Sequence, residues 1–203
     1  MNKKLVLFDL DGVLVDSKHN MMLSWNVVRE KHNIDVKFKD YFENIGRPFS
    51  DILDILNIKE NQNDIAQTYN KVSKQMIGKV SFYEGTKFVL NQLTDKRIKT
   101  GIVTSKDTLR CQFFLDLLGF EFDIVQTPNE KLQGKPAPDH LLYAMSELGV
   151  SAADTIYVGD MNVDYETAKR AEVDYVHASW GYGVCSDENT IKLKEISQLM
   201  EII

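Results

Sequence analysis

The segment Phe8-Asp-Leu-Asp-Gly-Val-Leu-Val-Asp-Ser17 places two carboxylates directly after the apolar run Leu5–Phe8. The two like charges repel each other, and the low dielectric beside a hydrophobic core disfavours both of them. A bound cation offsets both effects, and Gly12 allows the chain to turn sharply away from that cation. The segment therefore predicts a buried strand that ends in a cation-dependent site at Asp9 and Asp11.

Short apolar runs and amphipathic stretches alternate along much of the remaining chain. The predicted strands are residues 5–8, 99–104, 122–126, 155–159 and 173–178. The predicted helices are residues 86–93, 108–118, 138–148 and 164–171, with Pro138 in the first turn of its helix. Strands rich in Val and Ile that alternate with helices are typical of a parallel sheet covered on both faces. We therefore predict an α/β fold with a Rossmann-like parallel-sheet core.

Residues 17–80 interrupt this alternation because they contain no strand pattern. Their apolar residues recur at helical spacing, for example at Met21/Trp25/Val28 and Ile52/Ile55/Leu56. We predict a core formed by residues 1–16 and 81–203, with a helical cap formed by residues 17–80 after the first strand. Ligands of open α/β sheets bind at the carboxyl ends of the strands, so a cap at this point covers the site and excludes water.

The overall composition is that of an ordinary globular protein and excludes several classes of partner. Of the 203 residues, 43% are hydrophobic and 27% are charged, with a formal net charge of -6 and no basic run that would bind nucleic acid or a membrane. Cys111 and Cys185 form no metal-binding or disulfide motif. The MNKK start leaves no room for a signal peptide, and no apolar run is long enough to span a membrane, so we expect a cytoplasmic protein. A monomer and a homodimer are both compatible with the sequence.

Polar residues also follow the other predicted strands, and parallel strands end at the same edge of a sheet. The residues expected to meet Asp9 and Asp11 at this edge are Thr104, Lys135, Asp160 and Asp164. Carboxylates without His or Cys favour Mg²⁺, whereas a lysine and a hydroxyl group bind phosphate. Beside such a metal, one carboxylate can attack phosphorus and a second can protonate the leaving oxygen.

Four segments together resemble the phosphatase branch of the haloacid dehalogenase-like superfamily. They are Phe8–Gly12, Thr104–Lys106, Gly134–Asp139 and Gly159–Asp164. Each segment alone is a weak signal, but their order and their positions after strands are specific, and the resemblance covers essentially the whole chain. It is closest to the phosphoglycolate phosphatase and β-phosphoglucomutase-like members that have a helical cap.

The resemblance implies a role for each matching residue. Asp9 matches the nucleophile that forms an aspartyl-phosphate, and Asp11 matches the general acid and base. The family's Mg²⁺ is held by groups that correspond to the Asp9 side chain, the Asp11 backbone carbonyl and Asp160. Asp164 corresponds to a residue that orients metal-bound water or the lysine.

The resemblance also implies a phosphate-binding set, namely Thr104, Ser105 and Lys135. In the cap, Arg47 is the candidate for contact with a substrate anion. Family members that cleave other bonds lack an Asp two residues after the nucleophile, so Asp11 indicates phosphate-ester chemistry. The aromatic segment Trp180–Gly183 is interpreted as a packed turn.

The leading prediction is a Mg²⁺-dependent phosphatase that hydrolyses a small phosphate monoester, similar to phosphoglycolate or a sugar phosphate, through an aspartyl-phosphate. One alternative is a sugar phosphomutase similar to β-phosphoglucomutase, because Arg47 follows Gly46 much as an Arg follows a cap glycine in some of those mutases. A second alternative is a regulatory protein that binds phosphate without turnover.

Overall fold

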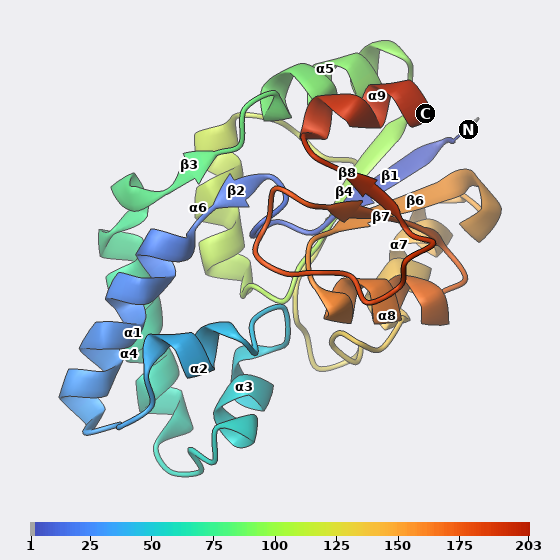
Figure 1. Cartoon of the computed structure of the whole chain (residues 1–203). Helices are drawn as coiled ribbons and strands as arrows, with labels where there is room; N and C mark the ends of the chain where they lie inside the picture. Colours follow the sequence, from blue (N-terminus) through green and yellow to red (C-terminus); the bar gives the residue numbers. More distant parts are fainter. Residues whose placement is uncertain (1–2) are drawn as a thin grey trace.

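A central parallel sheet organises the computed structural model, which describes residues 3–203 (Figure 1). Its strand order is β5-β4-β1-β6-β7-β8, and all neighbouring strands run parallel. The strands are β1 (Leu5–Phe8), β4 (Lys99–Val103), β5 (Ile124–Gln126), β6 (Thr155–Gly159), β7 (Asp174–Ala178) and β8 (Ile191–Leu193). The predicted α/β fold and its five strands are confirmed. The sequence analysis missed β8, an edge strand in which only Leu193 is buried.

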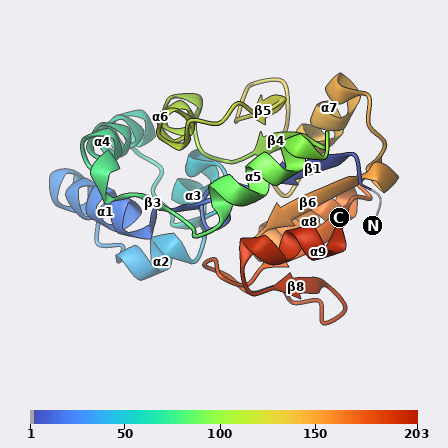
Figure 2. The same ribbon diagram turned by 90° about the horizontal axis from the view of Figure 1, so that it is seen from above.

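Helices cover both faces of this sheet (Figure 2). They are α5 (Thr86–Asp95), α6 (Thr108–Leu118), α7 (Asp139–Leu148), α8 (Asn162–Arg170) and the short α9 (Leu199–Ile202), with 3-10 turns η2 (Ala152–Asp154) and η3 (Ile196–Gln198). Pro138 was predicted inside the first turn of α7, but it occupies the N-cap position immediately before that turn. At either position, its missing N–H costs no helical hydrogen bond.

Strand β1 shows why the core strands are apolar at every position. Val6 and Phe8 pack in one hydrophobic cluster with side chains of α5 and α6. Leu5 and Leu7 point to the opposite face and pack with α7 and α8. Successive side chains of a strand alternate between faces, so a sheet covered on both faces requires an unbroken apolar run.

Residues 17–80, called the helical segment below, contain four helices and a separate hydrophobic cluster. The helices are α1 (Lys18–His32), α2 (Phe38–Phe42), α3 (Phe49–Ile55) and α4 (Gln62–Gln75), followed by the 3-10 turn η1 (Ile77–Lys79). Trp25 stacks on Tyr41 with ring centroids 4.4 Å apart, and Tyr69 lies in the same cluster. The helical segment therefore has a hydrophobic core of its own.

Two short strands connect the helical segment to the sheet. Strand β2 (Val15–Asp16) leaves the core and β3 (Ser81–Phe82) returns to it. They pair antiparallel, with Asp16 opposite Ser81, and we call this pair the β2–β3 ribbon. Within residues 3–203, no helix is both long enough and apolar enough to cross a membrane.

Candidate active site

Three buried carboxylates meet at the carboxyl end of the central strands. Asp9 follows β1, Asp160 follows the adjacent strand β6, and Asp164 lies in the first turn of α8. One carboxylate oxygen of each lies within 4.8 Å of the other two, and all three residues are buried. The parallel pairing of β1 with β6 therefore brings together side chains that are about 150 residues apart in the sequence.

Lys135 is the cation that the described chain places among these carboxylates. Its Nζ lies 2.8 Å from Asp9 Oδ1 and 2.7 Å from Asp164 Oδ1. Burial alone would lower the pKa of Lys135, but the two carboxylates outweigh burial and raise this pKa above its usual value. The lysine therefore remains charged beside Asp9.

Both carboxylate oxygens of Asp164 accept hydrogen bonds, which distinguishes Asp164 from Asp160. Its Oδ1 accepts from Lys135 and from the Tyr157 hydroxyl at 3.0 Å, and its Oδ2 accepts from the Met161 N–H at 3.0 Å. A carboxylate held in this way positions Lys135 and leaves little capacity for a metal ligand bond.

Asp160 has one oxygen without a partner. Its Oδ2 accepts from the Tyr182 N–H at 2.7 Å, whereas the described residues provide no hydrogen-bond donor to the buried Oδ1. Burial, followed by repulsion from Asp164 and Asp9, raises the pKa of Asp160 well above its usual value. Burial also raises the pKa of Asp9 to about 7, although Lys135 opposes this effect. An oxygen-rich site with uncompensated negative charge fits a divalent cation such as Mg²⁺, held by Asp9 and Asp160.

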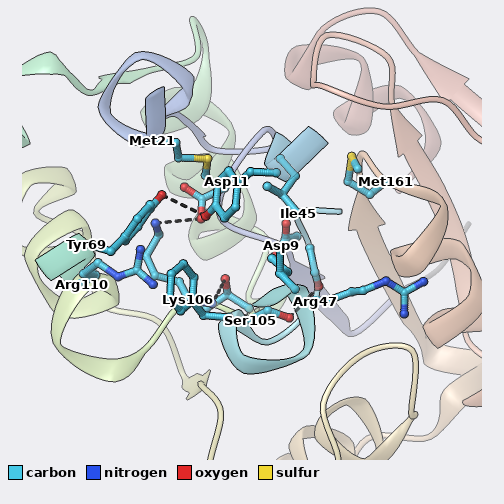
Figure 3. A pocket seen from close by; sticks show the side chains of 15 residues that line it. Asp9, Asp11, Met21, Ile45, Arg47, Tyr69, Ser105, Lys106, Arg110 and Met161 are labelled. Atoms are coloured by element: carbon cyan, nitrogen blue, oxygen red, sulfur yellow. Dashed lines mark hydrogen bonds and ion pairs between the residues drawn. The ribbon is translucent and has the colours of Figure 1, made fainter. Parts of the chain in front are cut away.

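Asp11 is paired with a different cation from the one that contacts Asp9 and Asp164. Its Oδ2 lies 2.9 Å from Lys106 Nζ (Figure 3). Its Oδ1 accepts a hydrogen bond from the Ser17 hydroxyl. Lys106 is buried, and burial lowers its pKa although Asp11 raises it. The sequence analysis missed Lys106 as a site residue. Its only sequence signal is its position in Thr104-Ser-Lys106 after a strand.

Thr104 and Ser105 lie where β4 ends. Thr104 Oγ1 accepts from the Lys106 N–H at 3.2 Å. Ser105 Oγ donates to the Gly46 carbonyl of the helical segment at 2.6 Å. Neither residue caps α6, because Asp107 is the N-cap and accepts from the Arg110 N–H.

A small cavity lies between these strand ends and the helical segment (Figure 3). Its volume is about 50 Å³, which holds only a few water molecules. Its lining includes Asp9, Asp11, Thr104, Ser105, Lys106 and Arg110 from the core and Met21, Tyr41, Ile45, Phe49, Ile52 and Tyr69 from the helical segment. Arg47 also borders the cavity, but Figure 3 shows its guanidinium directed away from Asp9 and Asp11.

The segment Trp180–Gly183 does more than pack. Trp180 is partly buried, and its indole N–H donates to the Val13 carbonyl at 2.9 Å, as expected for a packed turn. Tyr182, however, donates its backbone N–H to Asp160 and accepts from the Ser17 N–H at 2.7 Å through its hydroxyl. This double contact could not be predicted from the sequence, because it depends on how β7 brings the segment over the site.

Comparisons with known proteins agree with this geometry. The family described as haloacid dehalogenase-like hydrolase matches residues 6–178. A phosphoglycolate phosphatase of Xylella fastidiosa is 31% identical over 191 residues, covering 88% of this chain and 81% of that protein. The pyrophosphatase PpaX of Halalkalibacterium halodurans is 31% identical over 182 residues, covering 85% of this chain and 82% of that protein.

The fold is likewise shared with solved structures. A hydrolase from Pseudomonas syringae superposes with a TM-score of 0.86 at 21% identity, covering 98% of this chain and 97% of that one. The match of the family over residues 6–178 confirms the resemblance inferred from the four segments. The chain therefore belongs to the haloacid dehalogenase-like hydrolases.

Proposed function

We propose that this protein is a Mg²⁺-dependent phosphatase that hydrolyses a small phosphate monoester through an aspartyl-phosphate on Asp9. The observation that carries the proposal is the placement of Asp9, which is buried, is paired with Lys135, lines the cavity and has a carboxylate oxygen within 4.8 Å of an oxygen of Asp160. The phosphatase names of the two relatives support the same class of reaction.

In this proposal, Mg²⁺ is held by the Asp9 and Asp160 carboxylates together with the backbone carbonyl of Asp11. The bound ion supplies positive charge that offsets the carboxylates and the oxygens of the phosphoryl group. Asp164 positions Lys135 through the ion pair described above and contributes no ligand.

The proposed chemistry uses two carboxylates in sequence. An Asp9 oxygen attacks phosphorus while the bond from phosphorus to the leaving oxygen breaks, and Asp11 donates its proton to that oxygen. Lys135, Thr104 and the backbone at Ser105 bind the phosphoryl oxygens. Asp11 then removes a proton from the water that attacks phosphorus, which releases phosphate and restores Asp9. Lys106 positions the Asp11 carboxylate between these two proton transfers.

We propose that the helical segment, residues 17–80, acts as a cap on this reaction. In the structure it closes over Asp9 and Asp11, leaving a volume of about 50 Å³. Excluding water in this way strengthens each electrostatic contact with the phosphoryl group. The phosphomutase alternative rested on Arg47, whose guanidinium points away from the carboxylates of the cavity (Figure 3).

Release of inorganic phosphate tests the proposal. The substrates are a panel of small phosphate monoesters, assayed with Mg²⁺ and with EDTA, and the variants are Asp9→Asn and Asp95→Asn. We expect metal-dependent release by the wild type and by Asp95→Asn, whose side chain is exposed on α5, and none by Asp9→Asn. An Asp9→Asn enzyme with the wild-type rate would refute the aspartyl-phosphate mechanism.

A further inference from the structure

We propose that the substrate carries a second anionic group on its leaving side, a carboxylate or a phosphate, which is bound by Arg110 and by the hydroxyl pair of Tyr41 and Tyr69. This inference rests on the proposed phosphatase function, because it names the class of alcohol or acid that leaves. Nothing in the reaction itself requires these three residues, and all of them line the cavity beside Asp11.

Arg110 is a buried guanidinium that the proposed chemistry does not use. It lies in the first turn of α6 and is 8% exposed. Its Nε donates to Asp107, and the guanidinium carbon lies 4.9 Å from the centre of the Tyr69 ring. Asp107 occupies the Nε donor, and the guanidinium also interacts with the Tyr69 hydroxyl. The remaining N–H donors of the terminal amino groups are available to a planar or tetrahedral anion.

Asp107 does not itself line the cavity. Its side chain is 35% exposed, whereas the Arg110 side chain is 10% exposed. The ion pair therefore anchors Arg110 from its more exposed side, while the guanidinium borders the cavity. Two nearby lysines are paired as well, Lys106 of the cavity lining with Asp11 and Lys135 with Asp9, but the carboxylates that pair with them take part in the proposed reaction and Asp107 does not.

The two tyrosines add a neutral donor beside this charge. The Tyr41 hydroxyl, from α2, donates to the Tyr69 hydroxyl, from α4, at 3.1 Å. Two hydroxyl groups that share one hydrogen bond retain one O–H proton, and no other residue of the described chain accepts it. Burial raises the pKa of both tyrosines, so the pair stays protonated and can donate to an anion.

The small cavity volume narrows the substrate class further. About 50 Å³ admits a leaving group of only a few heavy atoms while the helical segment is closed. An uncharged alcohol would leave the guanidinium N–H groups that do not reach Asp107, and the tyrosine proton, without an anionic acceptor, and a buried polar site strongly rejects such an analogue. A short leaving group with a terminal carboxylate or phosphate satisfies both.

A matched pair of substrates tests the inference. The two esters are 2-phosphoglycolate and 2-hydroxyethyl phosphate, which are similar in size and differ in having a carboxylate or a hydroxymethyl group. We expect the wild type to prefer the carboxylate by at least ~30-fold in kcat/KM. Pyrophosphate, assayed in parallel, shows whether a phosphate serves better than a carboxylate as the second anion.

Variants separate binding from a merely structural role of Arg110. In Arg110→Met the preference for the carboxylate should fall to about 3-fold or less, chiefly through KM, and Arg110→Lys should recover part of it. Tyr69→Phe should lower kcat/KM roughly 3- to 10-fold for the anionic substrate and leave kcat/KM for the uncharged ester unchanged. Lys87→Met, exposed on α5, is the control and should keep the wild-type ratio. An equal loss on both esters in Arg110→Met and Tyr69→Phe would mean that these residues only hold α4 against α6, and would overturn the inference.

The outcome also separates this inference from the proposed function. Hydrolysis of both esters at similar rates by the wild type overturns the second-anion inference and leaves the phosphatase intact. If no ester is hydrolysed, titration calorimetry of the same two esters and pyrophosphate decides the matter. If the wild type binds the two anionic compounds more tightly than 2-hydroxyethyl phosphate, and Arg110→Met does not, the second-anion inference is supported although the phosphatase proposal fails. If the wild type binds all three compounds equally, both are overturned.

Discussion

Asp160 combines complete burial with an oxygen that the described chain leaves without a donor. Burial and the neighbouring carboxylates raise its pKa, so the metal-free folded state holds a proton that the unfolded chain releases. A carboxyl group with a raised folded pKa costs stability as the pH rises, because its charged form is disfavoured only in the folded state. Asp160 therefore lowers the stability of the metal-free protein as the pH rises from the pKa of the unfolded state through the higher pKa of the folded state.

The variant Asp160→Asn removes this charge while keeping the shape of the side chain. We expect metal-free Asp160→Asn to be more stable than the metal-free wild type near pH 8 by about 1–3 kcal/mol, and to gain nothing from added Mg²⁺. Urea unfolding at about pH 6 and about pH 8, with EDTA and with Mg²⁺, measures both effects. A variant that is less stable than the wild type at the higher pH would contradict the electrostatic account.

The turn after β1 and the loop after β7 approach each other so closely that glycine is required. Gly12 has a φ of +82°, and a Cβ there would lie 2.1 Å from Asp160 Oδ2. A Cβ on Gly181 would lie 2.5 Å from the Gly12 carbonyl oxygen and 2.4 Å from Asp160 Cβ. These contacts are mostly with backbone or with the base of a short side chain, which have little freedom to move.

Gly181→Ala tests this close approach. We expect it to destabilise the protein by about 1–3 kcal/mol and to weaken Mg²⁺ binding, because the added methyl group displaces Asp160. Gly78→Ala is the matched control, since its Cβ meets nothing within 4 Å and its backbone needs no left-handed conformation. Thermal unfolding and Mg²⁺ titration of both variants provide the comparison, and indistinguishable behaviour would show that the loop adapts freely.

The elements also show which features a sequence can predict. Strands β1 and β6, which end immediately before Asp9 and Asp160, are buried on both faces. Their apolar runs are therefore unbroken and easily recognised in the sequence. The charged residues that follow them are adjacent to those runs in the sequence. Arg110 and Tyr69, by contrast, meet only because α4 packs beside α6, and no local pattern encodes that packing. Such a long-range contact needs the tertiary structure.

At the scale of the whole molecule, contacts of Tyr182 join the sheet-containing core to the helical segment. Tyr182 accepts a hydrogen bond from the buried Ser17 N–H where α1 begins, and its hydroxyl lies 3.1 Å from Asp16 Oδ1 on the β2–β3 ribbon. Its ring also packs against Phe42 of the helical segment, with centroids 5.2 Å apart. The loop after β7 therefore fastens the helical segment to the core.

Tyr182→Phe should loosen this attachment without removing the ring. The Ser17 N–H loses its acceptor, so we expect a loss of about 1–3 kcal/mol and faster amide exchange at Ser17. Tyr143→Phe, on the exposed side of α7, is the control. Urea unfolding and hydrogen exchange by mass spectrometry give the two readouts, and unchanged exchange around residue 17 would show that the ribbon holds the closed form unaided.

The β2–β3 ribbon has a consequence for how this protein can be rebuilt. Asp16 and Ser81 face each other as partners in an antiparallel pair, so the chain enters and leaves the helical segment at the same place. A two-residue Asn-Gly turn is sufficient to join such a pair as a hairpin. We therefore expect that another module with adjacent ends can be spliced in place of residues 17–80 without stretching the sheet.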